Sequence, residues 1–269
     1  MKPIFTSLIV TSLMTSLSTL AKQTCTDIEN EVWSNNQCTK FETYKSTQLT
    51  SSPALAIVLH GDAHNYQPAE QYRIAQKLAS QQKNVIAVGM LRPGYTDDWG
   101  RTSDGRLGDT VGDNYDDETI KQIALAIQAL KQQHNASKVV VLGHYGGATI
   151  LGRLLGIYPN LVDSAVLASC NCNINDWRAT LYERLKLDVL KDDLDTKTPM
   201  ELAKQVSDKT TISLIVGKDD ERTGPRYSRE YYDSLKKNGK QVSLQLIDGN
   251  HYIFNNEIVL DTVSNALKL

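Results

Sequence analysis

The chain has 269 residues, of which 41% are hydrophobic and 22% charged, enough to bury one sizeable α/β core. Its formal net charge is -2, whereas nucleic-acid-binding proteins usually carry an excess of basic residues. The sequence also has no run of like charges that would predict a patch for binding a membrane surface. Composition therefore excludes a nucleic-acid partner and favours a small-molecule or peptide-like one. No linker or repeat divides the chain.

The first 21 residues have the pattern of a secretory signal peptide. One Lys lies near the start, an apolar Ser/Thr-rich stretch follows, and Ala21 offers a small residue for cleavage. An uncleaved membrane anchor is the alternative, for which the segment is short and polar. We expect cleavage after Ala21, leaving residues 22–269 as one secreted or periplasmic domain without an integral membrane span.

Four cysteines fit an oxidising compartment. Cys25 and Cys38 bracket a short polar loop, which a disulfide would close and pin. Cys170 and Cys172 follow an apolar run and can form a tight bridge, remain buried thiols or pair otherwise, because four cysteines allow three connectivities. There is no Cys-x-x-Cys pair and no nearby His, so we expect no metal.

Beyond the N-terminal region, buried strands alternate with amphipathic helices. Strands are expected at 54–59, 84–90, 138–142, 164–168, 211–217 and 242–247, and helices at 70–82, around 120–130, after the strand at 138–142 and from 225 to 239. Parallel neighbours need helical crossovers, so this order predicts a mostly parallel sheet with helices on both faces. The charged segment 176–206 is expected to form a small helical cap.

The most informative segment is the turn after the strand at 138–142. A β-branched run reaches Gly143-His144-Tyr145-Gly146-Gly147 and then enters a helix-forming segment, which is the pattern of a Gly-x-Ser-x-Gly nucleophile elbow. The glycines suit a strained turn where strand and helix backbones approach closely. Tyr145 stands where the nucleophilic serine is expected.

Two further residues complete a triad in chain order. Asp220 and His251 each follow a predicted strand, in the order nucleophile, acid, base. Asp219 is the close competitor for the acid. A lone His is usually structural and a lone Asp usually solvated, but their joint placement favours an orienting carboxylate and a general base.

An oxyanion hole is expected beside this triad. His60-Gly61-Asp62 follows the strand at 54–59, and the backbone N–H groups of Asp62 and Gly146 are predicted to hold a developing negative charge.

Several motifs in order carry a family resemblance. They are Leu59-His60-Gly61-Asp62, Leu91-Arg92-Pro93-Gly94-Tyr95-Thr96-Asp97, Gly112-Asp113-Asn114-Tyr115, the turn at 143–147, and Ser169-Cys170-Asn171-Cys172 with Trp177-Arg178. From about Ala54 to Phe254 the chain resembles bacterial α/β-hydrolases related to secreted esterases and prolyl-oligopeptidase-type hydrolases. The resemblance implies a single-domain α/β-hydrolase fold, ester or amide hydrolysis with Asp220 and His251 as acid and base, and no cofactor.

The tyrosine leaves three hypotheses open. The chain is a pseudoenzyme that binds a ligand or partner, a working hydrolase with a Tyr nucleophile or a water activated by His251, or a site-specific variant of a serine esterase. In a simpler alternative, Tyr145 is a packing residue and the catalytic serine lies elsewhere. The available serines, Ser103, Ser137 and Ser169, lack the elbow pattern. The phenol oxygen of Tyr145 lies a ring's length beyond a serine oxygen, so activity is expected to be low or absent.

Overall fold

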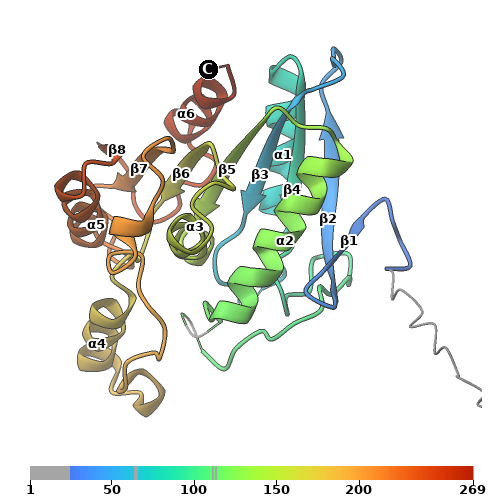
Figure 1. Cartoon of the computed structure of the whole chain (residues 1–269). Helices are drawn as coiled ribbons and strands as arrows, with labels where there is room; N and C mark the ends of the chain where they lie inside the picture. Colours follow the sequence, from blue (N-terminus) through green and yellow to red (C-terminus); the bar gives the residue numbers. More distant parts are fainter. Residues whose placement is uncertain (1–24, 64–65, 111, 113, 269) are drawn as a thin grey trace, which may run out of the picture.

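The computed structural model describes residues 25–63, 66–110, 112 and 114–268. The signal peptide expected at 1–21 lies outside these residues. The described chain forms one sheet of eight strands in the order β1-β2-β4-β3-β5-β6-β7-β8 (Figure 1). The strands are β1 (Glu31–Ser34), β2 (Gln37–Lys45), β3 (Ala54–Leu59), β4 (Val85–Met90), β5 (Lys138–His144), β6 (Ser164–Ala168), β7 (Thr211–Gly217) and β8 (Gln241–Ile247).

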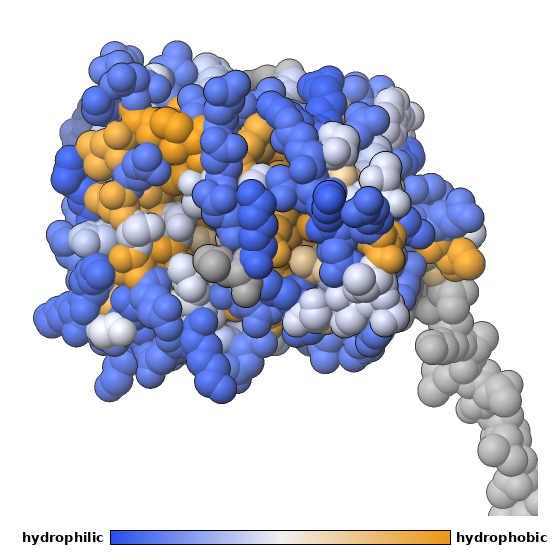
Figure 2. Space-filling view, turned by 90° about the horizontal axis from the view of Figure 1, so that it is seen from above, coloured by the Kyte–Doolittle hydropathy of each residue, from blue (hydrophilic) through white to orange (hydrophobic). Residues whose placement is uncertain are grey.

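The described chain has six α-helices, of which α1, α2, α3, α5 and α6 cover the two faces of the sheet (Figure 1). They are α1 (Glu70–Gln81), α2 (Asp117–Gln133), α3 (Gly146–Ile157), α4 (Ile174–Leu185), α5 (Pro225–Lys237) and α6 (Glu257–Lys268). Apolar residues of α1 and α6 share one core cluster, and those of α2, α3 and α5 share another on the opposite face. Seen from above, the surface is mostly hydrophilic, with apolar residues gathered toward one side (Figure 2).

The strands from β3 to β8 are parallel, as the alternation of strands and helices predicts. Every residue of β3, β4 and β6 is buried, which explains their continuous apolar runs. Parallel strands bring their carboxyl ends to one edge of the sheet, where connecting loops form sites. The fold is therefore the predicted α/β architecture, with its candidate site at that edge.

The N-terminal region corrects one expectation. Where we expected a polar loop between Cys25 and Cys38, the chain forms an antiparallel hairpin, β1–β2, and β2 pairs antiparallel with β4. Asn35 and Asn36 both adopt positive φ, at 49° and 60°, as a tight two-residue hairpin turn requires.

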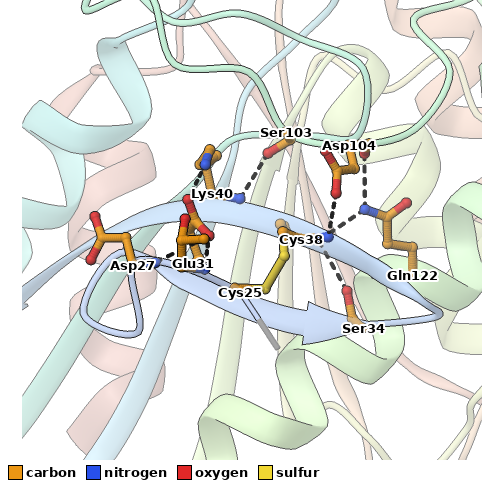
Figure 3. The surroundings of a disulfide bond; sticks show 11 residues. Cys25, Asp27, Glu31, Ser34, Cys38, Lys40, Ser103, Asp104 and Gln122 are labelled. Carbon is orange, nitrogen blue, oxygen red and sulfur yellow. Dashed lines mark hydrogen bonds and ion pairs between the residues drawn. A yellow bond between two sulfur atoms is a disulfide. The ribbon is translucent and has the colours of Figure 1, made fainter. Parts of the chain in front are cut away.

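The two cysteine pairs are both closed. The expected disulfide joins Cys25 to Cys38, and a second joins Cys170 to Cys172. Figure 3 shows the first bridge at the hairpin, where the Cys38 backbone N–H donates to Asp104 Oδ2 at 2.8 Å. The hairpin is thereby fixed to the loop that follows β4.

The expected cap is less helical than its composition indicated. Between β6 and β7 the chain forms α4, followed by short 3-10 turns at Asp188–Leu190 and Ala203–Gln205 with irregular segments around them. In Figure 1, α4 extends away from the sheet on the side opposite the label of the C-terminus. No helix in the described part of the chain has the length and apolar character needed to cross a membrane.

Candidate active site

The turn between β5 and α3 has the backbone of a nucleophile elbow. Tyr145 has φ 51° and ψ -114°, a conformation that bulky residues rarely adopt and that costs about 1–3 kcal/mol. Its backbone N–H donates to the Ala168 carbonyl at 2.9 Å, and its own carbonyl accepts from the Thr149 N–H at 3.0 Å. Neighbouring strand and helix therefore hold the strained residue in place.

Close packing explains the glycines around Tyr145. A Cβ on Gly147 would lie 2.5 Å from the carbonyl oxygens of Leu59 and His60, and one on Gly143 would lie 2.5 Å from the Gly147 carbonyl oxygen. Both distances are too short for a real side chain, so β3, β5 and α3 meet backbone to backbone. The elbow geometry is thus set by packing and does not depend on the side chain at position 145.

Asp220 and His251 lie together at the ends of β7 and β8. His251 Nδ1 is 3.0 and 3.1 Å from the two Asp220 carboxylate oxygens, and both residues are buried. Asp219, the competitor, is exposed and accepts no hydrogen bond from His251 in the described structure. With Nδ1 donating to a carboxylate, Nε2 is left free to accept a proton.

The carboxylate of Asp220 is held by its own turn. The backbone N–H groups of Arg222 and Thr223 donate to Oδ1 at 2.9 and 2.8 Å, and the Thr223 hydroxyl lies 2.9 Å from Oδ2. Burial alone would raise the pKa of Asp220, but its hydrogen bond and electrostatic interaction with His251, together with the Thr223 N–H, hold that pKa well below its ordinary value. Asp220 is therefore ionised and fixed in orientation.

Tyr145 contacts His251 by its ring. The two rings meet edge to face with centroids 4.8 Å apart, and Trp177 packs edge-on against Tyr145 at 5.9 Å. Within the described residues, the Tyr145 hydroxyl makes no hydrogen bond to His251. Burial, with the negative charge of Asp62 second, raises the pKa of Tyr145 well above its ordinary value. The phenol is therefore protonated at neutral pH and is not activated by the imidazole in this geometry.

Asp62, expected to contribute its backbone, also has a fully buried carboxylate. Arg92 Nη1 donates to Oδ1 at 2.9 Å, and the Tyr115 hydroxyl donates to Oδ2 at 2.6 Å. This ion pair lies directly against the elbow, since a Cβ on Gly146 would be 2.5 Å from the Tyr115 oxygen and 2.8 Å from Arg92 Nη1. The Asp62 side chain thus lies beside Gly146, and the oxyanion-hole role of the two backbone N–H groups stays a prediction.

Two other histidines near the site are neutral. Burial, with the charge of Arg92 second, lowers the pKa of His60 well below its ordinary value. Burial, with His251 second, lowers the pKa of His144 to about 4. His144 Nε2 donates to the His251 carbonyl oxygen at 3.0 Å, so a neutral imidazole links the elbow to the loop after β8.

A cavity of about 290 Å³ opens onto these groups. Its walls combine His251 with aromatic and polar side chains from several loops. The lining residues are His60, Gly61, Asp62, Tyr66, Pro68, Glu70, Gln71, His144, Tyr145, Arg222, His251, Tyr252 and Phe254. The volume lies just below the range of about 300–1,000 Å³ that is usual for small-ligand sites. Tyr145 forms part of the cavity wall.

The sequence from 57 to 248 matches the model of the alpha/beta hydrolase fold family. The chain belongs to that family. Acylamino-acid-releasing enzymes are similar to it. The enzyme of Rattus norvegicus is 28% identical over 173 residues, which cover 57% of this chain and 23% of the relative. The enzyme of Sus scrofa is 27% identical over 240 residues, which cover 82% of this chain and 31% of the relative. The chain therefore spans less than a third of the length of these relatives.

Solved structures share the fold at low sequence identity. An acylaminoacyl peptidase of Pyrococcus horikoshii superposes with a TM-score of 0.66 at 17% identity, covering 87% of this chain and 38% of that one. The Butyrivibrio proteoclasticus protein Est1E, solved with ferulic acid bound, gives a TM-score of 0.63 at 16% identity and covers 88% of this chain and 96% of its own. These likenesses show the hydrolase fold.

Sequence reasoning gave no role to several residues that shape this hydrolase site. Arg92 and Tyr115 lie in segments that carry the family resemblance, but their convergence on Asp62 depends on the fold. Thr223 was detectable in principle, because a Thr three residues after a carboxylate often caps the same turn. Glu70 and Gln71 were visible only as the first turn of a helix.

Proposed function

We propose that this protein is a hydrolase-fold protein directed at carboxylic esters or amides that has kept the acid and base of the reaction and lost its nucleophile. In this proposal, Asp220 orients His251, and Asp62 and Gly146 offer backbone N–H groups to an acyl oxygen. The protein binds an acyl-type ligand in the cavity beside Tyr145 and turns it over slowly or not at all.

One observation carries the proposal: the rings of Tyr145 and His251 pack edge to face, and within the described residues the Tyr145 hydroxyl makes no hydrogen bond to His251. A serine at this position would place its oxygen one bond beyond Cβ, whereas the phenol oxygen lies across a ring. Misplacement by about 1 Å already costs about a hundredfold in rate. The raised pKa of Tyr145 further opposes formation of a phenolate.

The test is to restore the serine. Tyr145→Ser should raise hydrolysis of short-chain p-nitrophenyl esters from background by several orders of magnitude, because losing a triad nucleophile costs about a millionfold in kcat. In the restored chain the serine oxygen attacks the acyl carbon, its proton passes to His251 Nε2, and the leaving group takes that proton as the acyl–enzyme forms. Adding His251→Ala should abolish the gain.

A second candidate is direct attack by water on the acyl carbon, with its proton accepted by His251. The observation that favours it is the free Nε2 of His251, which has no hydrogen-bond partner among the described residues and belongs to a cavity-lining side chain. Turnover by the unmodified protein that survives Tyr145→Phe and disappears with His251→Ala would support this mechanism. Turnover that disappears with Tyr145→Phe would instead identify Tyr145 as a nucleophile. Either result, at a rate comparable to that of Tyr145→Ser, would contradict the proposal that the natural chain turns its ligand over slowly or not at all.

A further inference from the structure

The cavity that contains His251 also reaches the first turn of α1. Glu70 and Gln71 begin that helix and line the cavity together with Pro68. The proposed acyl-transfer chemistry uses none of these residues. Their polar groups therefore form a part of the cavity wall with no assigned role.

Gln71 has a hydrogen-bond acceptor without a partner. The residue is fully buried, and its Nε2 donates to the Pro68 carbonyl oxygen at 3.2 Å. Its Oε1 has no hydrogen-bond partner among the described residues. A buried polar atom left in this state costs about 1–3 kcal/mol, so a ligand N–H that reaches Oε1 would recover a real stabilisation.

Glu70, the residue before Gln71, adds a negative charge to the lining of the same cavity, and its side chain is still exposed to solvent. Within the described chain its carboxylate forms no hydrogen bond and no ion pair, and Arg73 acts on it only at longer range. Burial raises the pKa of Glu70, with Arg73 opposing that rise. An acid in the first turn of a helix also offsets the helix dipole, but this role does not require a place in a cavity wall.

The other charges of the cavity leave this wall as its negative end. The Asp62 carboxylate is already taken by Arg92 and Tyr115. Arg222, which lies 5.3 Å from the centre of the Tyr252 ring, adds a positive charge to the lining of the same cavity. A cationic group entering the cavity is therefore attracted toward Glu70 and repelled by Arg222.

We propose that Glu70 and Gln71 form a subsite for a protonated amine, so that the ligands of this protein are amino-acyl or short peptide compounds with a free amino group. The ammonium group would pair with the Glu70 carboxylate and donate a hydrogen bond to Gln71 Oε1. This inference rests on the proposed function, because it assumes that the same cavity takes ester or amide ligands.

Binding of two matched probes to the unmodified protein tests the subsite without any need for turnover. The probes are phenylalaninamide and its N-acetyl derivative, which differ in the charge of one nitrogen. At about pH 6 an α-amino group is protonated. Isothermal titration should show tighter binding of the amine by about tenfold, which corresponds to about 1.4 kcal/mol. Glu70→Gln should remove that preference.

Glu257→Gln provides the matched control, because Glu257 lies in the first turn of α6, is exposed and is absent from the cavity wall. It should keep the preference while losing a comparable helix-dipole contribution. Equal affinity for both probes, no binding of the amine at millimolar concentration, or a preference unchanged by Glu70→Gln would each overturn the subsite. A failure of Tyr145→Ser to gain activity would count against the proposed function alone, because these titrations do not depend on it.

Discussion

The two halves of the candidate site are held in different ways. At the ends of β7 and β8, side chains hold one another: Asp220 is fixed by its own turn and holds His251 at 3.0 Å. At the elbow, the backbone is held by glycine contacts that are independent of the side chain at position 145. The first half preserves a chemical arrangement, whereas the second preserves a shape.

This difference explains how the fold accommodates a tyrosine in the strained turn between β5 and α3. The strained φ of 51° is imposed by strand, helix and glycine packing, so it persists when the side chain changes. An exchange in the other half would break the hydrogen bonds that define it. Under the proposed function, this scaffold loses its nucleophile with little structural cost but cannot lose its acid and base in the same way.

The largest expected effect comes from breaking the half held by side chains. In the Tyr145→Ser protein, Asp220→Asn should lower kcat by about ten-thousandfold, because an amide in place of the carboxylate favours the wrong imidazole tautomer. Asp219→Asn is the matched control, and we expect it to leave kcat nearly unchanged since Asp219 is exposed. Steady-state ester hydrolysis measures both. A comparable loss in the two variants would contradict the assignment of Asp220 as the acid.

The next largest effect is expected from a substitution at the elbow, where close backbone packing sets the geometry. Gly146→Ala should destabilise the protein by about 3–5 kcal/mol, because its Cβ meets the buried Asp62–Arg92 pair and would force it apart. Gly239→Ala is the comparison, since that glycine has φ 71° and open space around it. Its strain should cost only about 1–2 kcal/mol. Denaturant unfolding of both variants would sharpen the contrast; a loss in Gly146→Ala no larger than that in Gly239→Ala would show that the Asp62–Arg92 pair accommodates the new Cβ, because Gly146 has no positive φ to add strain.

The sequence predicts the central sheet well, because strands that are buried on both faces have continuous apolar sequences. It does not reveal the β1–β2 hairpin, whose buried positions include the polar residues Glu31, Ser34 and Thr39. The last two bond each other through their hydroxyls at 3.0 Å, so burial there depends on paired polar groups and leaves no apolar pattern.

The candidate site divides in the same way. Chain order places an acid, Asp219 or Asp220, near His251, because each follows a parallel strand and the carboxyl ends of these strands meet at one edge. The structure gives the contact to Asp220. The ion pair between Asp62 and Arg92 joins residues from two loops and is visible only in three dimensions. The unpaired Oε1 of Gln71 could not be predicted either, because it depends on the positions of all neighbouring donor groups in the folded chain.

His144 connects the two halves and gives the smallest of the expected effects. It lies in the elbow sequence, donates to the His251 carbonyl and stacks on Phe254 with ring centroids 5.0 Å apart. An unfolded histidine binds a proton below about pH 6.5. The folded chain protonates His144 only below about 4. Between these values protons bind preferentially to the unfolded state, so stability falls as the pH is lowered.

His144→Asn should make this fall shallower, because an asparagine N–H can still donate to the His251 carbonyl but does not titrate. The unfolding free energy of the natural chain should drop by about 3 kcal/mol more than that of the variant between pH 6.5 and 4. His60, which is lowered in the same direction, remains in both proteins and cancels in the difference. Urea unfolding at a series of pH values measures the two slopes. Parallel slopes would show that His144 accepts a proton in the folded state, and that the link between the halves does not require a neutral imidazole.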